Sequence, residues 1–252
     1  MILVDLGKLF PFFHIIYSLV LLSGLYQIGH LIFRINVLKN IINHVSEIKY
    51  QKILISINLI LLIFYPIILF TKNVNIIPYL SISIFAFGII NIFRISKKKL
   101  NIRNIKFKKL QIDTWIIIIV LFSLFLLSLS PNTHGDSLGY HFVVAKKLLS
   151  TGKYLADLTH FHSLLSGSGE ILIAIGLFFG SEQFGGLVQF SGLISLYGIF
   201  KKIETKNKLF FCLLALTSPV IIFLSSTAKP QLFHICSVAL VFSLYFFEKE
   251  HF

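Results

Sequence analysis

A large share of the side chains capable of acid–base chemistry lies in one polar segment, residues 131–183. Four of the nine histidines in the chain fall in it. They are His134, His141, His160 and His162, and the segment also holds Asp136, Asp157, Glu170 and Glu182. Ionisable side chains beside long apolar blocks are costly unless they are solvated or functional. This segment is therefore the first place to look for a functional site.

Asp136 is the first candidate catalytic residue. It immediately precedes residues 137–149, whose apolar stripe predicts an amphipathic helix lying on the membrane surface. The stripe consists of Leu138, Phe142, Ala145 and Leu149. An aspartate at a helix start commonly caps free backbone N–H groups. A carboxylate oriented in that way can also act as a general base, so the capping role and the catalytic role are compatible.

Two further charged residues lie at predicted helix starts. Glu170 opens a short apolar run, 166–180, where the helix dipole favours a carboxylate. Lys229 lies in "SSTAKPQLF", where a cation opposes the dipole of the following helix, which favours a functional role for it. The alternative for Lys229 is a side chain that simply extends its ammonium group to the membrane surface.

The motifs "HGD" and "HFH" leave a divalent metal ion open as a cofactor. Imidazole and carboxylate groups are plausible ligands for such an ion, and His134, His160 and His162 are the candidate metal-binding histidines. Their spacing matches no established metal motif. The alternative is that each of them is a solvated loop residue.

The composition predicts an all-α fold, a polytopic transmembrane helix bundle of about seven spans. The chain is 56% hydrophobic and only 13% charged, and its apolar residues form blocks of membrane length. These blocks are 10–33, 53–71, 77–95, 114–130, 184–200, 209–226 and 230–247. The net charge of +13 comes from basic residues between the blocks, which indicates membrane topology and not nucleic-acid binding. The block 184–200 is rich in Gly and Ser, which predicts a span packed inside the bundle.

Charge asymmetry orients the predicted bundle. The basic segments 94–109 and 201–208 are both expected on the cytoplasmic side, so an even number of crossings must separate them. The run 166–180 then cannot span, and it either lies at the interface or dips in and returns. The outer loop 131–183, with its interfacial helices, is expected on the outer face of a bacterial cytoplasmic membrane. We divide the chain into residues 1–113, N-terminal transmembrane helices with a basic cytoplasmic loop, and residues 114–252, which carry the outer loop.

The order of motifs across residues 114–247 resembles a known enzyme family. A span and a loop with an early Asp are followed by "YH…AK…L…GKY", by "GEIL" and "FFG", and by "SP…SS…AKPQ". This pattern is similar to the polyprenyl-phosphate-dependent membrane glycosyltransferases of the GT-C superfamily, of the dolichyl-phosphate-mannose mannosyltransferase and aminoarabinose transferase type. Members of that family are considerably longer, so the resemblance leaves open that this chain is an N-terminal fragment.

The resemblance implies roles for particular residues. Asp136 matches the catalytic acidic position of the outer loop, and Glu170 matches an acidic position in the short helix. Tyr140 and His141 match the start of a juxtamembrane helix and are expected to bind substrate. Lys229 is the candidate for the donor phosphate.

The implied reaction moves a sugar from a polyprenyl-phosphate donor to a glycan, lipid or protein acceptor at the outer face. Either Lys229 or Lys147 can stabilise the departing phosphate. Two other functions remain open. One is a non-catalytic membrane assembly protein. The other is a transporter component, which requires ionisable groups at mid-bilayer depth. His30 and His234 are the main internal candidates, with Glu170 added if its helix dips deep into the membrane.

Overall fold

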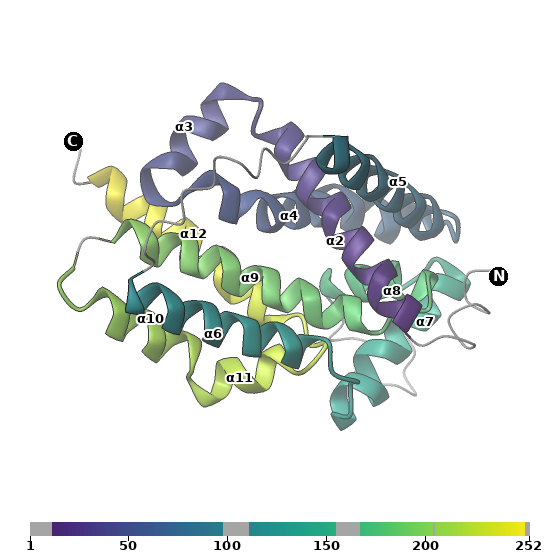
Figure 1. Cartoon of the computed structure of the whole chain (residues 1–252). Helices are drawn as coiled ribbons and strands as arrows, with labels where there is room; N and C mark the ends of the chain where they lie inside the picture. The colour runs from purple at the N-terminus through teal and green to yellow at the C-terminus, as the bar shows by residue number, and fades with distance from the viewer. Residues whose placement is uncertain (1–11, 98–110, 155–166, 204, 250–252) are drawn as a thin grey trace.

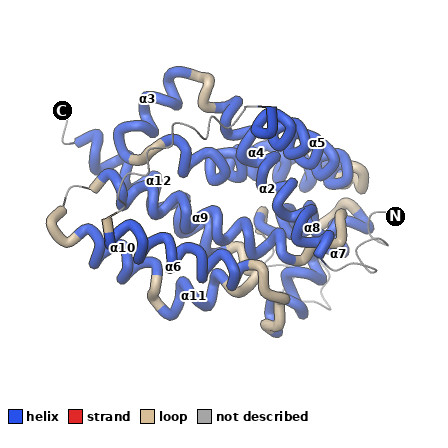
Figure 2. Tube along the Cα trace, in the orientation of Figure 1, coloured by secondary structure: helices blue, strands red, loops and turns tan. Residues whose placement is uncertain are grey.

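Every regular element in the described part of the chain is a helix. The computed structural model describes residues 12–97, 111–154, 167–203 and 205–249, and the all-α prediction is confirmed for them (Figure 2). The helices are α2 (Phe12–Ile32), α3 (Asn36–Val45), α4 (Ile48–Thr71), α5 (Ile76–Lys97), α6 (Ile112–Ser128), the π-helical turn η2 (Ser137–His141), α7 (Phe142–Thr151), α8 (Gly169–Phe178), α9 (Gln183–Lys202), α10 (Lys208–Leu216), α11 (Pro219–Ser225) and α12 (Gln231–Lys249).

Three helices, α2, α4 and α5, are long and apolar enough to cross a membrane. A fourth crossing results if α10 and α11 count as one span bent by 52°. The bend follows from the sequence, because Ser218 caps α11 by accepting a hydrogen bond from the Ile221 N–H, and Pro219 occupies the first helical position. Helices α6, α8 and α12 are apolar but shorter. These helices are typical of a membrane protein.

Large apolar side chains cover much of the outer surface of the bundle. Phe70 on α4, Tyr79 on α5 and Ile112 on α6 are respectively 85%, 68% and 77% exposed. An apolar surface this extensive marks contact with lipid or with a partner, because water would disfavour it. This exposed apolar surface agrees with the high hydrophobic content of the chain.

Helix α9 runs through the centre of the bundle (Figure 1), where it contacts α2, α4, α6, α8, α10, α11 and α12. Its glycines permit close helix approach. An added Cβ at Gly186 would clash with the Ser128 carbonyl oxygen of α6, and one at Gly198 would lie 2.6 Å from the Tyr50 Cβ of α4. The prediction that this Gly- and Ser-rich segment is packed inside the bundle is confirmed.

Hydrogen bonds made by buried polar side chains also join the helices. The Gln51 amide on α4 donates to the Ser195 carbonyl of α9 at 2.9 Å and to the Ser46 hydroxyl at 2.6 Å. On the other side of α9, Gln189 accepts a hydrogen bond from the Phe233 N–H at 3.1 Å, which satisfies a free backbone donor in the first turn of α12. Such bonds fix the rotation of α9 relative to its neighbours.

The bundle has a basic end and an end that carries the polar segment. At the basic end, Lys201 of α9 pairs with Glu47, the residue before α4, at 2.5 Å, and Gly29 of α2 packs against the Lys52 backbone. At the opposite end, Gly152 packs against the α4–α5 turn, and the Ser181 hydroxyl donates to the His14 carbonyl of α2 at 2.6 Å. The described basic residues and the polar segment therefore lie at opposite ends of the bundle.

The helix after Asp136 differs from the prediction in register. Helical backbone runs from residue 135 to residue 151, but η2 is a π-turn that holds one more residue than an α-turn. The extra residue places Ser137 on the buried face and leaves Leu138 45% exposed, while Leu148 is fully buried. The apolar face packs on α8 inside the protein, so the prediction that it rests on the membrane surface is wrong.

Helix α8 is the short apolar run that cannot complete a crossing. Its ten residues reach about 15 Å, half of the hydrocarbon thickness. Every residue from Gly169 to Gly176 is buried. The helix is therefore an internal element of the bundle and does not lie on its surface.

The crossing of α2 and α5 yields a stability prediction. Gly88 faces the Val20 carbonyl and Gly24 faces the Ile84 carbonyl, both too closely to admit a Cβ. Gly88→Ala should therefore destabilise the protein by about 1–3 kcal/mol through overpacking, measured as a lower thermal unfolding temperature in detergent. Gly139→Ala is the matched control, because its methyl group would meet nothing within 4 Å. Equal unfolding temperatures for the two variants would contradict this account of the crossing.

Candidate functional site

The structure brings Asp136 and Lys229 together although 93 residues separate them in sequence. Asp136 lies in the first turn of the helical segment 135–151, and Lys229 lies in the turn between α11 and α12. The Lys229 Nζ donates to Asp136 Oδ2 at 2.6 Å. The Asp136 side chain is 65% exposed, whereas that of Lys229 is only 12% exposed. The pair therefore presents its carboxylate outward and holds its ammonium group against the protein.

Two adjacent glycines of α9 position the segments that carry this pair. Gly186 packs against Ser128 at the end of α6, and a Cβ at Gly185 would lie 2.9 Å from the Ala228 Cβ. Ala228 immediately precedes Lys229. The close approach of both segments to α9 thus sets the distance between the carboxylate and the ammonium group.

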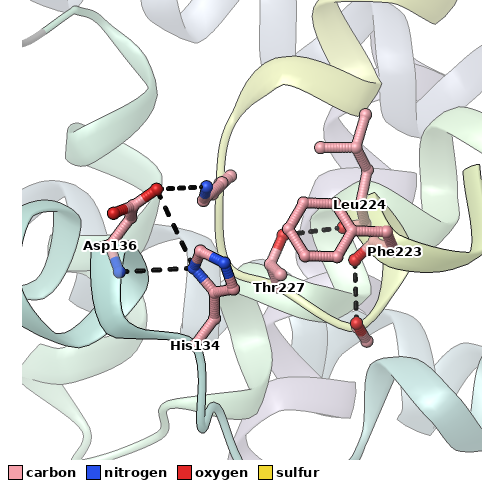
Figure 3. Close-up of polar contacts among 7 residues, drawn as sticks. His134, Asp136, Phe223, Leu224 and Thr227 are labelled. Carbon is pink, nitrogen blue, oxygen red and sulfur yellow. Dashed lines mark hydrogen bonds and ion pairs between the residues drawn. The ribbon is translucent and has the colours of Figure 1, made fainter. Parts of the chain in front are cut away.

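An imidazole and an aromatic ring complete this cluster (Figure 3). The His134 Nδ1 accepts a hydrogen bond from the Asp136 N–H at 3.3 Å and lies 4.0 Å from Asp136 Oδ2. The Phe223 ring packs edge-on against the His134 ring, with 5.0 Å between centroids, and lies 5.4 Å below the Lys229 Nζ. In the same turn, the Thr227 hydroxyl donates to the Leu224 carbonyl at 3.1 Å. The cluster therefore connects the start of the helical segment 135–151 with α11 and the α11–α12 turn.

The electrostatics of the pair favour an ionised carboxylate. The hydrogen bond and the positive charge of Lys229 lower the pKa of Asp136, and the nearby imidazoles contribute less. The backbone of Asp136 is already helical, with φ −65° and ψ −37°, and its side chain makes no capping hydrogen bond. The capping role considered from the sequence is therefore wrong, because the carboxylate is directed to Lys229.

A second pair, His141 and Glu170, is buried. The His141 Nδ1 lies 2.9 Å from Glu170 Oε1, and the two side chains are 6% and 1% exposed. The other carboxylate oxygen, Oε2, accepts the Gly167 N–H at 3.0 Å. The Tyr154 hydroxyl donates to the Gly167 carbonyl at 3.0 Å. Glu170 thus lies in the first turn of α8, as predicted, and its partner there is a histidine on the facing helix.

Tyr140 lies beside this buried pair. Its ring centroid is 4.3 Å from that of His141. Burial, with a smaller contribution from the charge of Glu170, raises the pKa of Tyr140 to about 12. The phenol is therefore neutral at physiological pH and can donate a hydrogen bond.

The two pairs are neighbours. Asp136 immediately precedes the π-turn η2 and His141 is its last residue. Gly169, next to Glu170, packs directly against Pro230, next to Lys229. π-turns inside helices are frequent at functional sites. One wall of the site is therefore the helical segment 135–151, and the other is formed by the start of α8 and the α11–α12 turn.

Four of the six predicted catalytic and substrate-binding residues lie in these two pairs, and Tyr140 is adjacent. Lys147 is not part of this grouping. It lies about three helical turns beyond Asp136, where its carbonyl accepts hydrogen bonds from Ser150 and Thr151.

Two of the candidate metal ligands are neighbours, and no third ligand joins them within the described ranges. His134 and Asp136 are close, but no group of three or more His, Cys, Asp or Glu side chains suited to a metal ion occurs there. His160 and His162 lie outside the described residues.

Sequence reasoning missed two polar side chains near Asp136. The Asn132 Oδ1 and the Ser137 hydroxyl are buried, and neither finds a hydrogen-bond partner within the described part of the protein. Buried polar atoms usually have partners, so these two are suited to binding a polar ligand. The only signal in the sequence is their nearness to Asp136.

The two pairs should differ in how strongly they couple. Glu170→Ala alone should destabilise the protein by about 1–3 kcal/mol, because it leaves His141 buried without its partner. A double-mutant cycle with His141→Ala should give a coupling energy of about 0.5–3 kcal/mol, measured by chemical unfolding in detergent. The cycle of Asp136→Ala with Lys229→Ala is the control and should show a smaller coupling energy, because water screens the exposed carboxylate of this pair. Additive effects at Glu170 and His141 would disprove the buried pair.

A known protein family matches the part of the chain that contains both pairs. No curated protein and no solved structure matches the chain. Residues 102–251 match the family described as the DUF1420 N-terminal domain. The match covers α6 to α12 and therefore includes both pairs, Asp136 with Lys229 and His141 with Glu170. The chain belongs to the DUF1420 N-terminal domain family.

Proposed function

We propose that the protein is a membrane glycosyltransferase that moves a sugar from a polyprenyl-phosphate donor to an acceptor at the outer face of the membrane. The observation that carries the proposal is the Asp136–Lys229 ion pair, at 2.6 Å, with an exposed carboxylate and a nearly buried ammonium group. The reaction needs one group of each kind, a base for the acceptor and a cation for the departing phosphate.

The donor phosphate separates the pair. As its anion approaches Lys229, it competes with Asp136 for the ammonium group, because phosphate offers several strong acceptor oxygens. Asp136 then becomes available to the acceptor. The exposure of its carboxylate supports this exchange, since water screens the carboxylate and can solvate it when it leaves the ammonium group.

The transfer step then forms one bond to the anomeric carbon and breaks another. The acceptor hydroxyl oxygen attacks the anomeric carbon and gives its proton to the Asp136 carboxylate. The bond between the anomeric carbon and the phosphate oxygen breaks, and the polyprenyl phosphate departs with the bonding electron pair. Lys229 stabilises the negative charge that develops on it.

The buried pair acts as a positioning element in this proposal. His141 and Glu170 hold the helical segment 135–151 against the start of α8, with Asp136 at one side of η2 and Tyr140 beside His141. The Tyr140 ring packs beside His141 in this element, and the Asn132 and Ser137 oxygens lie buried next to Asp136 in sequence, without hydrogen-bond partners in the described part of the protein. A base held by rigid neighbours is more effective than one on a free loop.

We further propose the topology of seven spans for this multi-pass protein in the bacterial cytoplasmic membrane. The spans are α2, α4, α5, α6, α9, the bent pair α10–α11, and α12. The arrangement of the helix ends supports it, because the described basic segments gather at one end and the polar segment lies at the other. Helix α8, with its length of about 15 Å, adds no crossing.

Substitution of Asp136 separates catalysis from structure. Asp136→Asn removes the base but keeps the size of the side chain, so transfer should fall by about two to four orders of magnitude. The assay uses membrane vesicles with the full protein and a polyprenyl-phosphate hexose labelled in the sugar, and it measures release of polyprenyl phosphate. Asp113→Asn, an exposed carboxylate at the start of α6, is the matched control and should leave transfer unchanged. Equal rates in Asp136→Asn and the parent protein would refute the role of Asp136.

Cysteine labelling checks the topology. Thr133→Cys and Asn75→Cys should react with a membrane-impermeant maleimide from outside intact cells, because both positions are exposed at the end that carries the polar segment. Thr205→Cys and Lys202→Cys, exposed at the basic end, should react only after permeabilisation. The native cysteines, Cys212 and Cys236, are buried and provide a low background. Labelling of all four positions from the same side would overturn the seven-span arrangement.

A further inference from the structure

A cavity of about 590 Å³ opens at the basic end of the bundle, between α2, α4 and α5. It lies far from the candidate site, at the opposite ends of these helices. Its lining includes Lys52 of α4, His30 of α2, and Arg94 and Lys97 of α5. Asn91 adds an amide at the cavity wall. The cavity is large enough for a small polar group and bears a concentrated positive charge.

The charge of Lys52 has no carboxylate to balance it within this cavity. Its ammonium group donates to the Tyr26 hydroxyl at 3.0 Å, lies 4.6 Å from the Tyr26 ring centroid, and approaches the His30 Nδ1 at 3.4 Å. Among the described residues, no Asp or Glu lines the cavity. A half-buried ammonium group held by the Tyr26 hydroxyl favours an anionic ligand, because the ligand would supply the missing countercharge.

The surface next to the cavity is apolar. On α5, Phe93 and Ile95 are 63% and 57% exposed, and Ile95 also lines the cavity. The exposed side chains of α5 continue from there along the helix with Ile92, Ile90 and Ile89. A ligand with both an anionic group and hydrocarbon chains would fit the cavity and this adjoining face together.

We propose that this cavity binds the phosphate headgroup of an anionic membrane lipid, with the acyl chains lying along α5. Lys52, Arg94 and Lys97 provide the charge, and Tyr26 orients the ammonium group of Lys52. Basic pockets between membrane helices on the cytoplasmic side recognise anionic headgroups in this way. The site would attach the α2–α4–α5 part of the bundle to one leaflet, independently of any catalytic function at the other end.

The test measures lipid binding to the full purified protein by native mass spectrometry, with phosphatidylglycerol and phosphatidylcholine added in equal amounts. The parent protein should retain phosphatidylglycerol preferentially. The double variant Lys52→Gln, Arg94→Gln should lose this preference by at least tenfold, because each basic side chain contributes roughly a fivefold factor. The control variant Lys39→Gln, Lys202→Gln removes the same charge from exposed positions at the same end and should retain the preference.

Inorganic phosphate distinguishes a lipid from a soluble anion. Millimolar phosphate should not displace phosphatidylglycerol, since it lacks the chains that contact α5. Displacement by phosphate, or equal retention of phosphatidylglycerol in both double variants, would overturn the proposal. The single variant Arg94→Gln alters an exposed side chain and keeps the test valid if the Lys52 substitution impairs folding. It should weaken the preference by roughly fivefold.

Discussion

The close packing of helix backbones around α9 is the constraint on which the rest of the structure depends. Gly185 and Gly186 admit the Ala228 and Ser128 segments to the α9 backbone, and each of these segments leads into one half of the Asp136–Lys229 pair. In a membrane the hydrophobic effect does not drive helices together, so close contact between small residues must do so. The geometry of the candidate site is therefore a consequence of how tightly α6 and α12 pack on α9.

The two pairs of the site have different energetic characters, which suits different roles. The buried His141–Glu170 pair is shielded from water, and loss of either partner would leave a polar group without compensation. The Asp136–Lys229 pair is solvated on the carboxylate side, so a competing anion can replace Asp136 with little loss. One pair is suited to maintaining the structure, and the other to exchanging partners.

The sequence predicted the elements of the fold better than the contacts between them. Hydrophobic blocks and glycine content located most of the helices, including the buried α9, because these properties are local. The rotation predicted for the helix after Asp136 was wrong. A strict 3.6-residue period cannot anticipate the π-turn, which places Ser137 inward and Leu138 outward. A helix on a membrane surface and one packed on α8 also show the same apolar stripe, so the pattern could not distinguish them.

The same limit, that local patterns do not predict contacts between elements, applies to the candidate site. Asp136, Glu170 and Lys229 stood out individually as charged residues near apolar helices. Their pairing depends on the packing of α8, α9 and the α11–α12 turn, which no local pattern records. The role of Lys147 stays a prediction, and its position on α7 lies about three turns from Asp136.

The sequence separation of the Asp136–Lys229 pair has a consequence for biosynthesis. The ribosome adds about 5–20 residues per second, so Lys229 emerges about 5–20 s after Asp136. During that interval the carboxylate has no ammonium partner, and the π-turn cannot yet be held by the α11–α12 turn. A nascent chain that stopped before Lys229 would contain the carboxylate without its ammonium partner, and its polar segment would be open to chaperones and proteases. Completion of the pair is thus a late event that marks a correctly assembled bundle.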